Sequence, residues 1–428
     1  MHMKKRIVTS ILFVAGCLSV FPTIAQDSIV TRPVIIVTDK EQIGDSEIIR
    51  KMYESNGEHF QDPRAPRFLF IDRQGKVALG IGGYVKGTMS VDMDGISNNL
   101  DFVTADIPVP NQADMRSQFQ MDASTSRLFL KLVGENTQVG DFTVYLESDF
   151  RGKNGHQYDM RLRQAYIQFW HLKIGRARTT FADAASSPPT IDFEGPSGSV
   201  STKNTMIQYS QALGKHWSMA MAFEAPSASY TTDKQLTETI KQRLPDIPSY
   251  IQYAWDEGKS HIRLSNLFRF LSYRNLAESQ NKFTFGWASQ LSGMFTASPH
   301  WIFYYQAAYG KGYADYLNDL SGSGYDLIPE GDSGKLEAPY ALGLVGGIQY
   351  NFSKNLFVSA SYSQCRLYAS SSLPETSYRY GQYIVANAFY SPFRNCMVGL
   401  EYLYGNRHDV NRTSGNAHRI NAMIQYHF

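Results

Sequence analysis

Apolar and polar residues alternate along most of this chain. From Gly75 to the last residue, segments of about 10–16 residues place apolar side chains on one face and polar or small side chains on the other. A period of two is the signature of a β-strand. The segments exceed the roughly 5–6 residues of an ordinary strand and suit a tilted strand crossing a membrane, which needs about 9–11.

The connections between these segments alternate strictly between short and long. Sixteen segments leave seven short turns and eight longer loops. The short turns are Asn136-Thr137, His171-Leu172, Gly214-Lys215, Asp256-Glu257-Gly258, Ser298-Pro299, Ser353-Lys354 and Ser391-Pro392. The longer loops are near 93–122, 151–157, 179–203, 226–246, 274–280, 310–338, 369–375 and 405–414. This pattern predicts an all-β protein, a transmembrane antiparallel β-barrel of about 16 strands with periplasmic turns and long outer loops.

The last strand supports the same interpretation. Residues 418–428 alternate in polarity and end on Phe428. A final amphipathic strand ending in an aromatic residue resembles the signal read by the barrel-assembly machinery, which we therefore expect as a partner. Aromatic residues also gather beside the turns, for example Trp170, Trp301, Phe352 and Phe393. These positions predict the two interfacial girdles of a barrel in outer-membrane lipid.

The N-terminus has the pattern of an export signal. A basic stretch at 4–6, an apolar run at 7–21 and small residues ending at Ala25 predict a cleaved signal peptide over residues 1–25. An alternative is a lipobox at 14–17 that would leave a lipidated Cys17. With cleavage after Ala25 only Cys365 and Cys396 remain, either as two thiols or as one optional bridge.

Residues 26–70 differ from the rest and predict a separate periplasmic N-terminal segment preceding a barrel over 71–428. Residues 45–53 show one short amphipathic helix with Asp45 as a plausible N-cap. Two roles remain open for this helix. It is either a surface linker or a contact for a partner or a trimer.

Composition narrows the class further. Charged residues make up 19% of the chain, below the usual ~25% of a soluble chain, and there are 27 Tyr and 25 Phe. Loss of the three basic residues at 4–6 takes the formal charge from +2 to −1, which gives no basic face for nucleic acid. The mean hydropathy is −0.32 and no apolar run of 18 residues follows the signal, so helical membrane spans are excluded.

Charges inside the strands predict the lumen face, because Arg or Lys facing lipid at mid-depth costs roughly 2–4 kcal/mol. This argument places the following residues in the lumen: Lys86, Arg127, Lys131, Glu147, Asp149, Arg263, Arg269, Glu401 and Arg419. Arg161 and Arg163 share a face with apolar residues further along their segment, so we expect a β-bulge or a strand that projects beyond the bilayer.

The loop over 179–203 carries the most chemistry. It follows Arg176 and Arg178 and holds the acids Asp183, Asp192 and Glu194. Three apolar residues could anchor it against the inner wall: Phe181, Ile191 and Phe193. Acids facing basic wall residues would set up a field across a narrow pore, and basic rings favour anions because Arg binds carboxylates in a bidentate manner. The alternative is an exposed acidic loop.

Several motifs then point to one family. They are Phe70-Ile71-Asp72, Gly75-Lys76, Gly80-Ile81-Gly82-Gly83-Tyr84-Val85-Lys86, Ser126-Arg127-Leu128, Glu147-Ser148-Asp149-Phe150, Arg161-Leu162-Arg163-Gln164-Ala165-Tyr166, Gly175-Arg176, Thr180-Phe181-Ala182-Asp183 and Asp192-Phe193-Glu194-Gly195-Pro196. The chain resembles the DcaP-like trimeric porins of Gram-negative outer membranes, densely over 70–200 and mainly in architecture beyond.

The resemblance implies a sixteen-stranded homotrimer, a third loop inside the pore and passive uptake of small anions such as dicarboxylates. It also implies that the basic residues of the matched motifs lie on the pore side: Arg127, Arg161, Arg163, Arg176 and Arg178. Members often carry an N-terminal coiled coil, but residues 26–70 show no heptads, so we expect no stalk of that kind here.

Two other classes of function remain alternatives. A barrel enzyme would need a Ser/His or Asp/His constellation, whereas the nine mature histidines are scattered. A receptor or adhesin could use the Tyr-rich loop 310–338. We predict a porin for small anionic solutes, without catalytic residues, metal or cofactor. Its predicted pore-lining residues are Arg127, Lys131, Arg161, Arg163, Arg176, Arg178, Asp183, Asp192, Glu194, Arg263 and Arg269.

Overall fold

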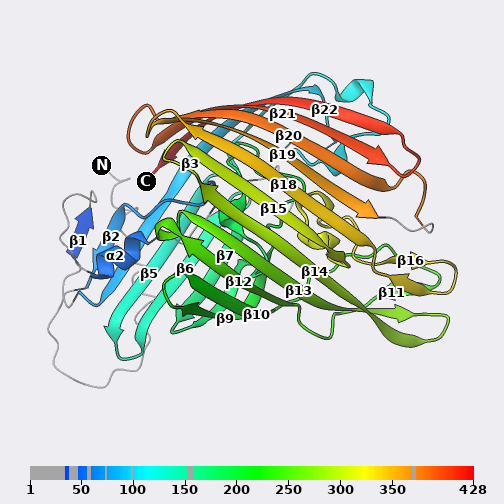
Figure 1. Ribbon diagram of the computed structural model, residues 1–428, viewed down its shortest axis with the longest axis horizontal. Helices are drawn as coiled ribbons and strands as arrows, with labels where there is room; N and C mark the ends of the chain where they lie inside the picture. The colour runs from blue at the N-terminus through cyan, green and yellow to red at the C-terminus, as the bar shows by residue number, and fades with distance from the viewer. Residues whose placement is uncertain are drawn as a thin grey trace, which may run out of the picture.

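The computed structural model describes residues 34–37, 47–54, 59–72, 75–97, 100–152, 158–368 and 373–428. Within these residues sixteen long antiparallel strands form a sheet that closes on itself (Figure 1). The strands are β3 (Val77–Asp94), β5 (Arg127–Thr137), β6 (Gly140–Asp149), β7 (Arg161–Phe169), β8 (Leu172–Arg178), β9 (Lys203–Leu213), β10 (Trp217–Glu224), β12 (Ile247–Trp255), β13 (Ser260–Asn275), β14 (Gln280–Thr296), β15 (Trp301–Lys311), β18 (Tyr340–Asn351), β19 (Leu356–Tyr368), β20 (Tyr378–Tyr390), β21 (Cys396–Asp409) and β22 (Ser414–His427). The last strand pairs with the first, from Tyr84↔His427 to Asp94↔His418, so the predicted barrel is confirmed.

The two ends of the barrel differ as the pattern of connections predicts. All the short turns lie at one end, where α2, β2 and the C-terminal residue Phe428 also lie, and the long loops lie at the other (Figure 1). The loops carry short strands of their own: β4 (Gln118–Asp122), β11 (Thr237–Thr239), and the hairpin of β16 (Ile328–Glu330) and β17 (Lys335–Glu337). One predicted loop, 405–414, is mostly strand, because β21 and β22 continue their pairing to His408↔Ser414.

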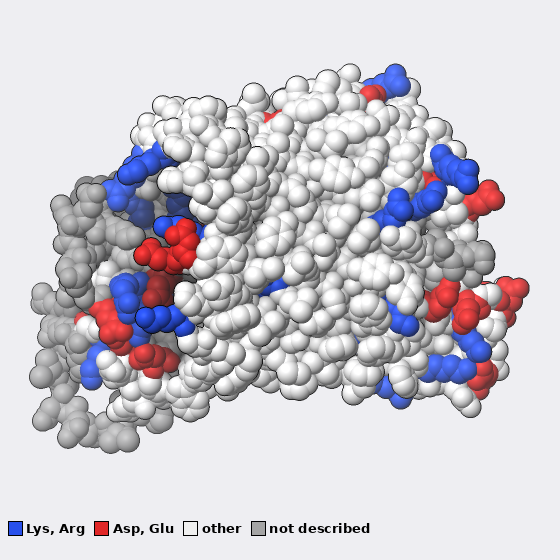
Figure 2. Space-filling view, in the orientation of Figure 1, with Lys and Arg blue, Asp and Glu red and all other residues white. Residues whose placement is uncertain are grey.

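Burial separates the two faces of the wall. The nine charged strand residues expected in the lumen are all buried, whereas outward neighbours such as Val85 and Leu128 are 61% and 40% exposed. Figure 2 shows the result on one side of the molecule, where Lys, Arg, Asp and Glu gather at the two ends and the middle band is almost free of them. This uncharged belt is the surface expected to face lipid.

Aromatic side chains form a continuous girdle near the short-turn end. Successive ring centroids lie 4.6–6.4 Å apart from β10 to the turn after β18. The chain of rings is Trp217, Tyr253, Trp255, Phe295, Phe303, Trp301, Tyr350 and Phe352. Amphipathic rings of this kind suit the boundary between lipid and water.

A bulge in β7 explains how Arg161 and Arg163 can point into the lumen although the same alternation places apolar, outward residues further along the strand. Gln164 pairs with Glu147 and Leu162 pairs with Ser148, so Arg163 is one extra residue in the ladder. The extra residue reverses the alternation at this point. Arg163 therefore turns inward although Ile167, further along the same strand, is exposed to the outside.

The N-terminal part packs on and in the barrel. β2 (Phe68–Ile71) pairs with β1 (Val34–Val37) and with β3, and α2 (Glu47–Tyr53) buries Ile48 and Met52 against the wall. Asp45, the predicted N-cap, lies outside the described residues. Residues 60–62 correct the prediction of a separate segment ending at 70, because their side chains pack inside the barrel, with Phe60 against rings of β19 and β20. No described helix has the length and apolar character needed to span a membrane.

Lys131 ties α2 to the barrel wall. Its buried ammonium donates to the carbonyls of Lys51, Met52 and Glu54 at 2.8, 3.2 and 2.9 Å. A cation at the C-terminal end of a helix satisfies carbonyls that have no partner within the helix. Lys131 thus holds the helix in place.

We expect Lys131→Met to release α2 from the barrel. Hydrogen bonds to a charged group contribute enough that protease cleavage within 47–54 should become about tenfold faster. The measurement is limited proteolysis of the detergent-solubilised barrel. Lys76→Met, at an exposed position of the same barrel end, is the control, and equal cleavage of the two variants would contradict the role of Lys131.

Candidate functional site

Long loops fold into the barrel and narrow it. The loop between β15 and β18 buries Tyr313, Tyr316, Leu317 and Leu320 in one apolar cluster with Phe181. The alternative in which the tyrosines of 310–338 form an exposed binding surface is therefore wrong for Tyr313 and Tyr316, which are buried. The apolar cluster closes part of the interior and leaves a smaller passage.

The loop over 179–203 crosses this interior and is held on the far wall. Glu401 of β21 accepts hydrogen bonds from the backbone N–H groups of Ile191 and Asp192, at 2.7 and 2.8 Å. Lys86 of β3 donates to the carbonyl of Ile191 at 2.9 Å. Ile191 itself packs in the cluster that contains Phe389. The loop thus spans from β8 and β9 to the strands around the closure of the barrel.

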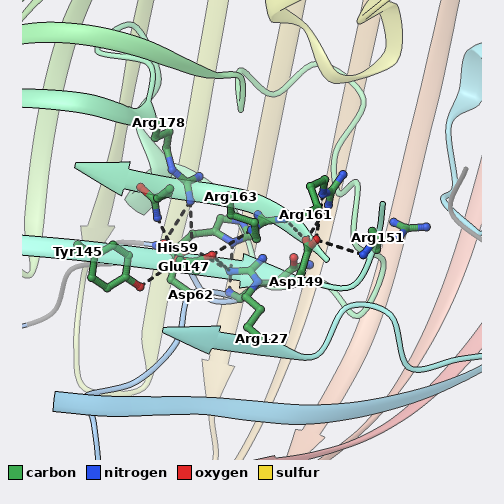
Figure 3. A network of polar contacts seen from close by, with 12 residues as sticks. His59, Asp62, Arg127, Tyr145, Glu147, Asp149, Arg151, Arg161, Arg163 and Arg178 are labelled. Carbon is green, nitrogen blue, oxygen red and sulfur yellow. Dashed lines mark hydrogen bonds and ion pairs between the residues drawn. The ribbon is translucent and has the colours of Figure 1, made fainter. Parts of the chain in front are cut away.

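An arginine cluster faces the loop from β5, β7 and β8 (Figure 3). Arg163 contacts Glu147 at 3.0 Å and Asp149 at 2.7 Å, and Arg161 holds Asp149 through two nitrogens at 2.9 and 2.7 Å. Arg127 lies 3.4 Å from Glu147. The two strand carboxylates thus fix the guanidinium groups in place, as bidentate pairing requires.

A third carboxylate in the cluster comes from the N-terminal segment. Asp62 contacts Arg178 at 3.1 Å and Arg127 at 3.4 Å. Burial acts to raise the pKa of Asp62, but the positive charges, that of Arg178 foremost, hold it well below its usual range. Burial and the charge of Arg178 lower the pKa of the neighbouring His59 to about 3, so this imidazole is neutral at pH 7.

Phe193 of the crossing loop lies among the arginines. Four guanidinium groups approach its ring, with the carbon Cζ 4.8–5.9 Å from the ring centroid. The four are Arg127, Arg151, Arg161 and Arg163. Cation–π attraction of this kind stabilises each contact by about 0.5–2 kcal/mol, more where water is excluded. Phe193 therefore positions the loop against the cluster and takes up space in the passage.

Two cavities meet at this cluster. The larger, about 960 Å³, opens toward the short-turn end and is lined by Lys131, Trp170, His171 and Arg263 among others. The smaller, about 330 Å³, is lined by five arginines and by Phe193 and Glu194. The five are Arg127, Arg161, Arg163, Arg176 and Arg178. Asp62 and Arg178 line both cavities and so form the boundary between them.

The smaller cavity has an excess of positive charge. Its five arginines face three carboxylates, those of Asp62, Glu147 and Asp149. Burial, with the nearby Asp101 and Asp192, raises the pKa of Glu194 to about 8, so this side chain carries little charge at pH 7. Among the described residues no carboxylate lies within 4.0 Å of Arg176.

Two of the predicted loop acids, Asp183 and Asp192, lie away from the arginine cluster. Asp183 contacts His261 at 2.9 Å and Ser292 at 2.7 Å, on the wall of β13 and β14. Asp192 accepts from the N–H of Phe102 and the hydroxyl of Tyr383, and burial beside Asp101 and Glu401 raises its pKa to about 7. Asp183 also faces the basic wall residue Arg263 at 3.9 Å, whereas the carboxylates beside the arginine cluster are those of Asp62, Glu147 and Asp149.

Arg269 and Arg263, two further residues predicted to line the pore, contact loops that fold against the inner wall. Arg269 is fully buried between Asp246 and Asp326, at 3.1 and 3.0 Å, and lines neither cavity. Arg263 lines the larger cavity and donates to the carbonyl of Ala182 at 3.0 Å. The expectation that Arg269 faces the open passage is wrong, because loops fold over the inner wall at its position.

Sequence reasoning missed Asp62 and His59 altogether. They precede the first barrel strand, and nothing in their spacing distinguishes them from a linker. Phe193 was recognised only as an apolar anchor, although an aromatic residue in a loop that follows several arginines could have suggested a cation–π contact. Among the described residues, no group of three His, Cys, Asp or Glu side chains could hold a metal ion. Cys365 and Cys396 are separate buried thiols.

A sixteen-stranded barrel with a lipid-facing belt and loops that narrow a charged passage defines a porin-like channel. The particular family follows from the sequence, because the model of the DcaP outer membrane protein family matches residues 72–428. The chain belongs to this family. It is therefore a channel of the outer membrane and not an enzyme. A comparison with curated proteins finds no match.

Solved structures support the same fold. The outer membrane channel DcaP of Acinetobacter baumannii is similar with a TM-score of 0.72 at 20% identity, over 84% of this chain and 99% of that one. OmpT of Vibrio cholerae gives a TM-score of 0.53 at 10% identity, over 82% and 98%. OmpF of Salmonella typhi gives 0.52 at 14% identity, over 84% and 99%. At these identities the likeness concerns the fold alone.

Proposed function

We propose that this channel conducts small hydrophilic solutes by passive diffusion and prefers anions, with dicarboxylates as the solute class. The observation that supports this most directly is the smaller cavity, where five arginines outnumber the three carboxylates that pair with them. Arginine binds carboxylates through two parallel hydrogen bonds, so the cavity is selective in geometry as well as in charge. Several arginines within one cavity could bind both ends of a dicarboxylate.

We further propose that the channel is a homotrimer inserted by the barrel-assembly machinery. OmpT of Vibrio cholerae, which shares the fold at 10% identity and a TM-score of 0.51, has been solved in a trimer form. Phe428 directly follows the last strand, and its backbone exchanges hydrogen bonds with Gly83 of β3 at 3.0 and 3.1 Å. An exported chain with such a final strand suits this insertion route, after removal of residues 1–25.

We expect the double substitution of Ala for Arg176 and Arg178 to shift selectivity away from anions. It removes two of the five arginine charges from the smaller cavity and leaves three, which only equal the three carboxylates, so the positive excess is lost. The measurement is the reversal potential of purified channels in a planar bilayer under a salt gradient. The anion-to-cation permeability ratio should fall severalfold, as expected when pore charges are removed.

The matched control removes the same charge elsewhere. Lys215 and Lys354 lie exposed in short turns, and changing both to Ala should leave the reversal potential as in the parent. A parent channel that selects cations would contradict the proposed preference. Unchanged potentials in the arginine double variant would contradict its assignment to these two residues.

A further inference from the structure

The N-terminal turn around Asp62 is built into the barrel interior. Asp62 accepts from the backbone N–H of His59 at 3.0 Å, and its own N–H donates to the carbonyl of His59 at 2.9 Å. These bonds orient the carboxylate toward Arg127 and Arg178 (Figure 3). The turn thus presents one carboxylate to the arginine cluster in a fixed geometry.

Neighbouring residues hold this turn across the lumen. Phe60 packs against Phe357 and Phe389, with ring centroids 5.8 and 4.8 Å away. Gln61 donates to the carbonyl of Asp192 in the crossing loop at 2.7 Å. Arg178 lies on the fifth barrel strand, and Phe357 and Phe389 lie on the thirteenth and fourteenth, so the turn reaches between opposite walls.

The inner wall leaves room for the segment that follows. A Cβ added at Gly80 would lie 2.5 Å from the ring of Pro66, and one at Gly82 would lie 2.9 Å from the Pro66 backbone. Both glycines are on the inward face of β3, between the buried Ala78 and Tyr84. The segment and the wall therefore fit only because these two positions lack side chains.

The arginines at this point have unused binding capacity. Arg127 is 1% exposed, and its Nε has no hydrogen-bond partner in the described structure. Arg178 shares its acceptor, Asp62, with Arg127. A buried guanidinium N–H without a partner costs free energy, and the contact of Arg127 Nη1 with Asp62 is long at 3.4 Å. A carboxylate with two free oxygens would therefore pair with this guanidinium better than Asp62 does.

We propose that Arg127 and Arg178 form a binding site for solute carboxylates that Asp62 occupies when no solute is bound. A solute carboxylate entering the smaller cavity displaces Asp62 and binds the same two guanidinium groups. It then passes the boundary between the cavities, and Asp62 returns behind it. This inference rests on the proposed function, because it names the step by which an anionic solute crosses the constriction.

Exchange of one carboxylate for another has a clear physical advantage. The guanidinium groups remain paired throughout, so neither buried cation is left without a carboxylate. A tethered competitor also keeps the affinity for the solute low. Conduction requires binding that is strong enough for the solute to enter and weak enough for it to leave. Asp62 makes release possible because it competes with the solute for the two arginines.

The test is succinate titration of purified, refolded channels in planar bilayers. Its readout is the succinate concentration that halves the chloride current. In Asp62→Asn this concentration should fall about tenfold, because the tethered competitor is gone. Asp62→Glu retains a carboxylate and should stay close to the parent. The double variant Asp62→Asn with Arg178→Ala should lose the gain.

Asp149→Asn is the matched control for a general change of field. It removes one carboxylate from the same arginine cluster but leaves Asp62 in place. An equal gain in Asp149→Asn and Asp62→Asn would overturn the displacement mechanism. Heat-resistant mobility in detergent electrophoresis reports whether each variant is folded. If Asp62→Asn does not fold, Gln61→Ala, which loosens the turn from the crossing loop, should give a smaller gain in the same direction.

The outcomes separate this inference from the proposed function. If the parent selects anions and responds to succinate but both Asp62→Asn and Gln61→Ala leave the titration unchanged, the displacement mechanism is wrong and the proposed function stands. If the parent neither selects anions nor responds to succinate, both are wrong.

Discussion

Arg269→Met is expected to destabilise the barrel by about 3–5 kcal/mol, the usual cost of removing one partner of a buried ion pair. Arg269 joins two loops to the wall, the loop between β10 and β12 and the loop between β15 and β18. It contacts Asp246 and Asp326 at 3.1 and 3.0 Å and donates to the carbonyls of Gly312, at 2.7 Å, and Ser227. Methionine fills much of the space but leaves two buried carboxylates without a positive partner. The measurement is the denaturant midpoint of the folded barrel in detergent.

The loss of stability in Arg269→Met should depend on pH. Burial raises the pKa of Asp326 to about 7, against the lowering effect of Arg269. Without Arg269 this pKa rises further above its unfolded value, so the folded variant is favoured while Asp326 is protonated and loses stability as the pH increases. Arg269→Met should therefore be closer to the parent at pH 5 than at pH 8.

Two control variants test this interpretation. Adding Asp246→Asn and Asp326→Asn to Arg269→Met should recover part of the stability, because no buried charge remains. Arg274→Met changes the same residue type on the same strand, where the side chain contacts Asn281 at an exposed position, and should have little effect. A loss in Arg274→Met as large as in Arg269→Met would contradict the proposed anchor.

Phe193→Ala is expected to widen the passage and to raise single-channel conductance about twofold, because pore diameter limits flow in a constriction of this kind. The ring lines the smaller cavity and lies within 6 Å of four guanidinium groups. Its removal takes away both the bulk and the cation–π contacts that hold the loop near the arginines. The measurement is conductance in a planar bilayer, with swelling of liposomes in larger sugars as a second measure of size exclusion.

Phe193→Leu is the matched control for this prediction. Leucine keeps most of the bulk but has no π-face, so its conductance should stay near that of the parent. Conductance in Phe193→Ala that equals or falls below the parent value would show that this ring does not limit the passage. A rise of the same size in Phe193→Leu would point to the cation–π contacts, not the bulk, as the limiting feature.

The sequence by itself determined the wall of this channel. Strand number, strand direction and the inward or outward face of each side chain follow from a local rule, because lipid outside and polar surroundings inside impose a period of two on every strand. Even the bulge at Arg163 was visible as a break in that period. The inward position of Lys86, Arg127 and Glu401 needed no knowledge of their partners, since the cost of a charge facing lipid excludes the other face.

Only the tertiary structure decided which charges meet in the lumen. Asp62 binds Arg178 across 116 positions in the sequence, and Asp183 meets His261 across 78. Loops and the N-terminal segment carry no repeating pattern, so the sequence could place Asp183 and Asp192 near the arginines as readily as Asp62. Their positions depend on packing between distant segments, such as Phe60 against β19 and β20 and Pro66 against Gly80. Packing between distant segments, and not local periodicity, therefore determines which carboxylate lies in the constriction.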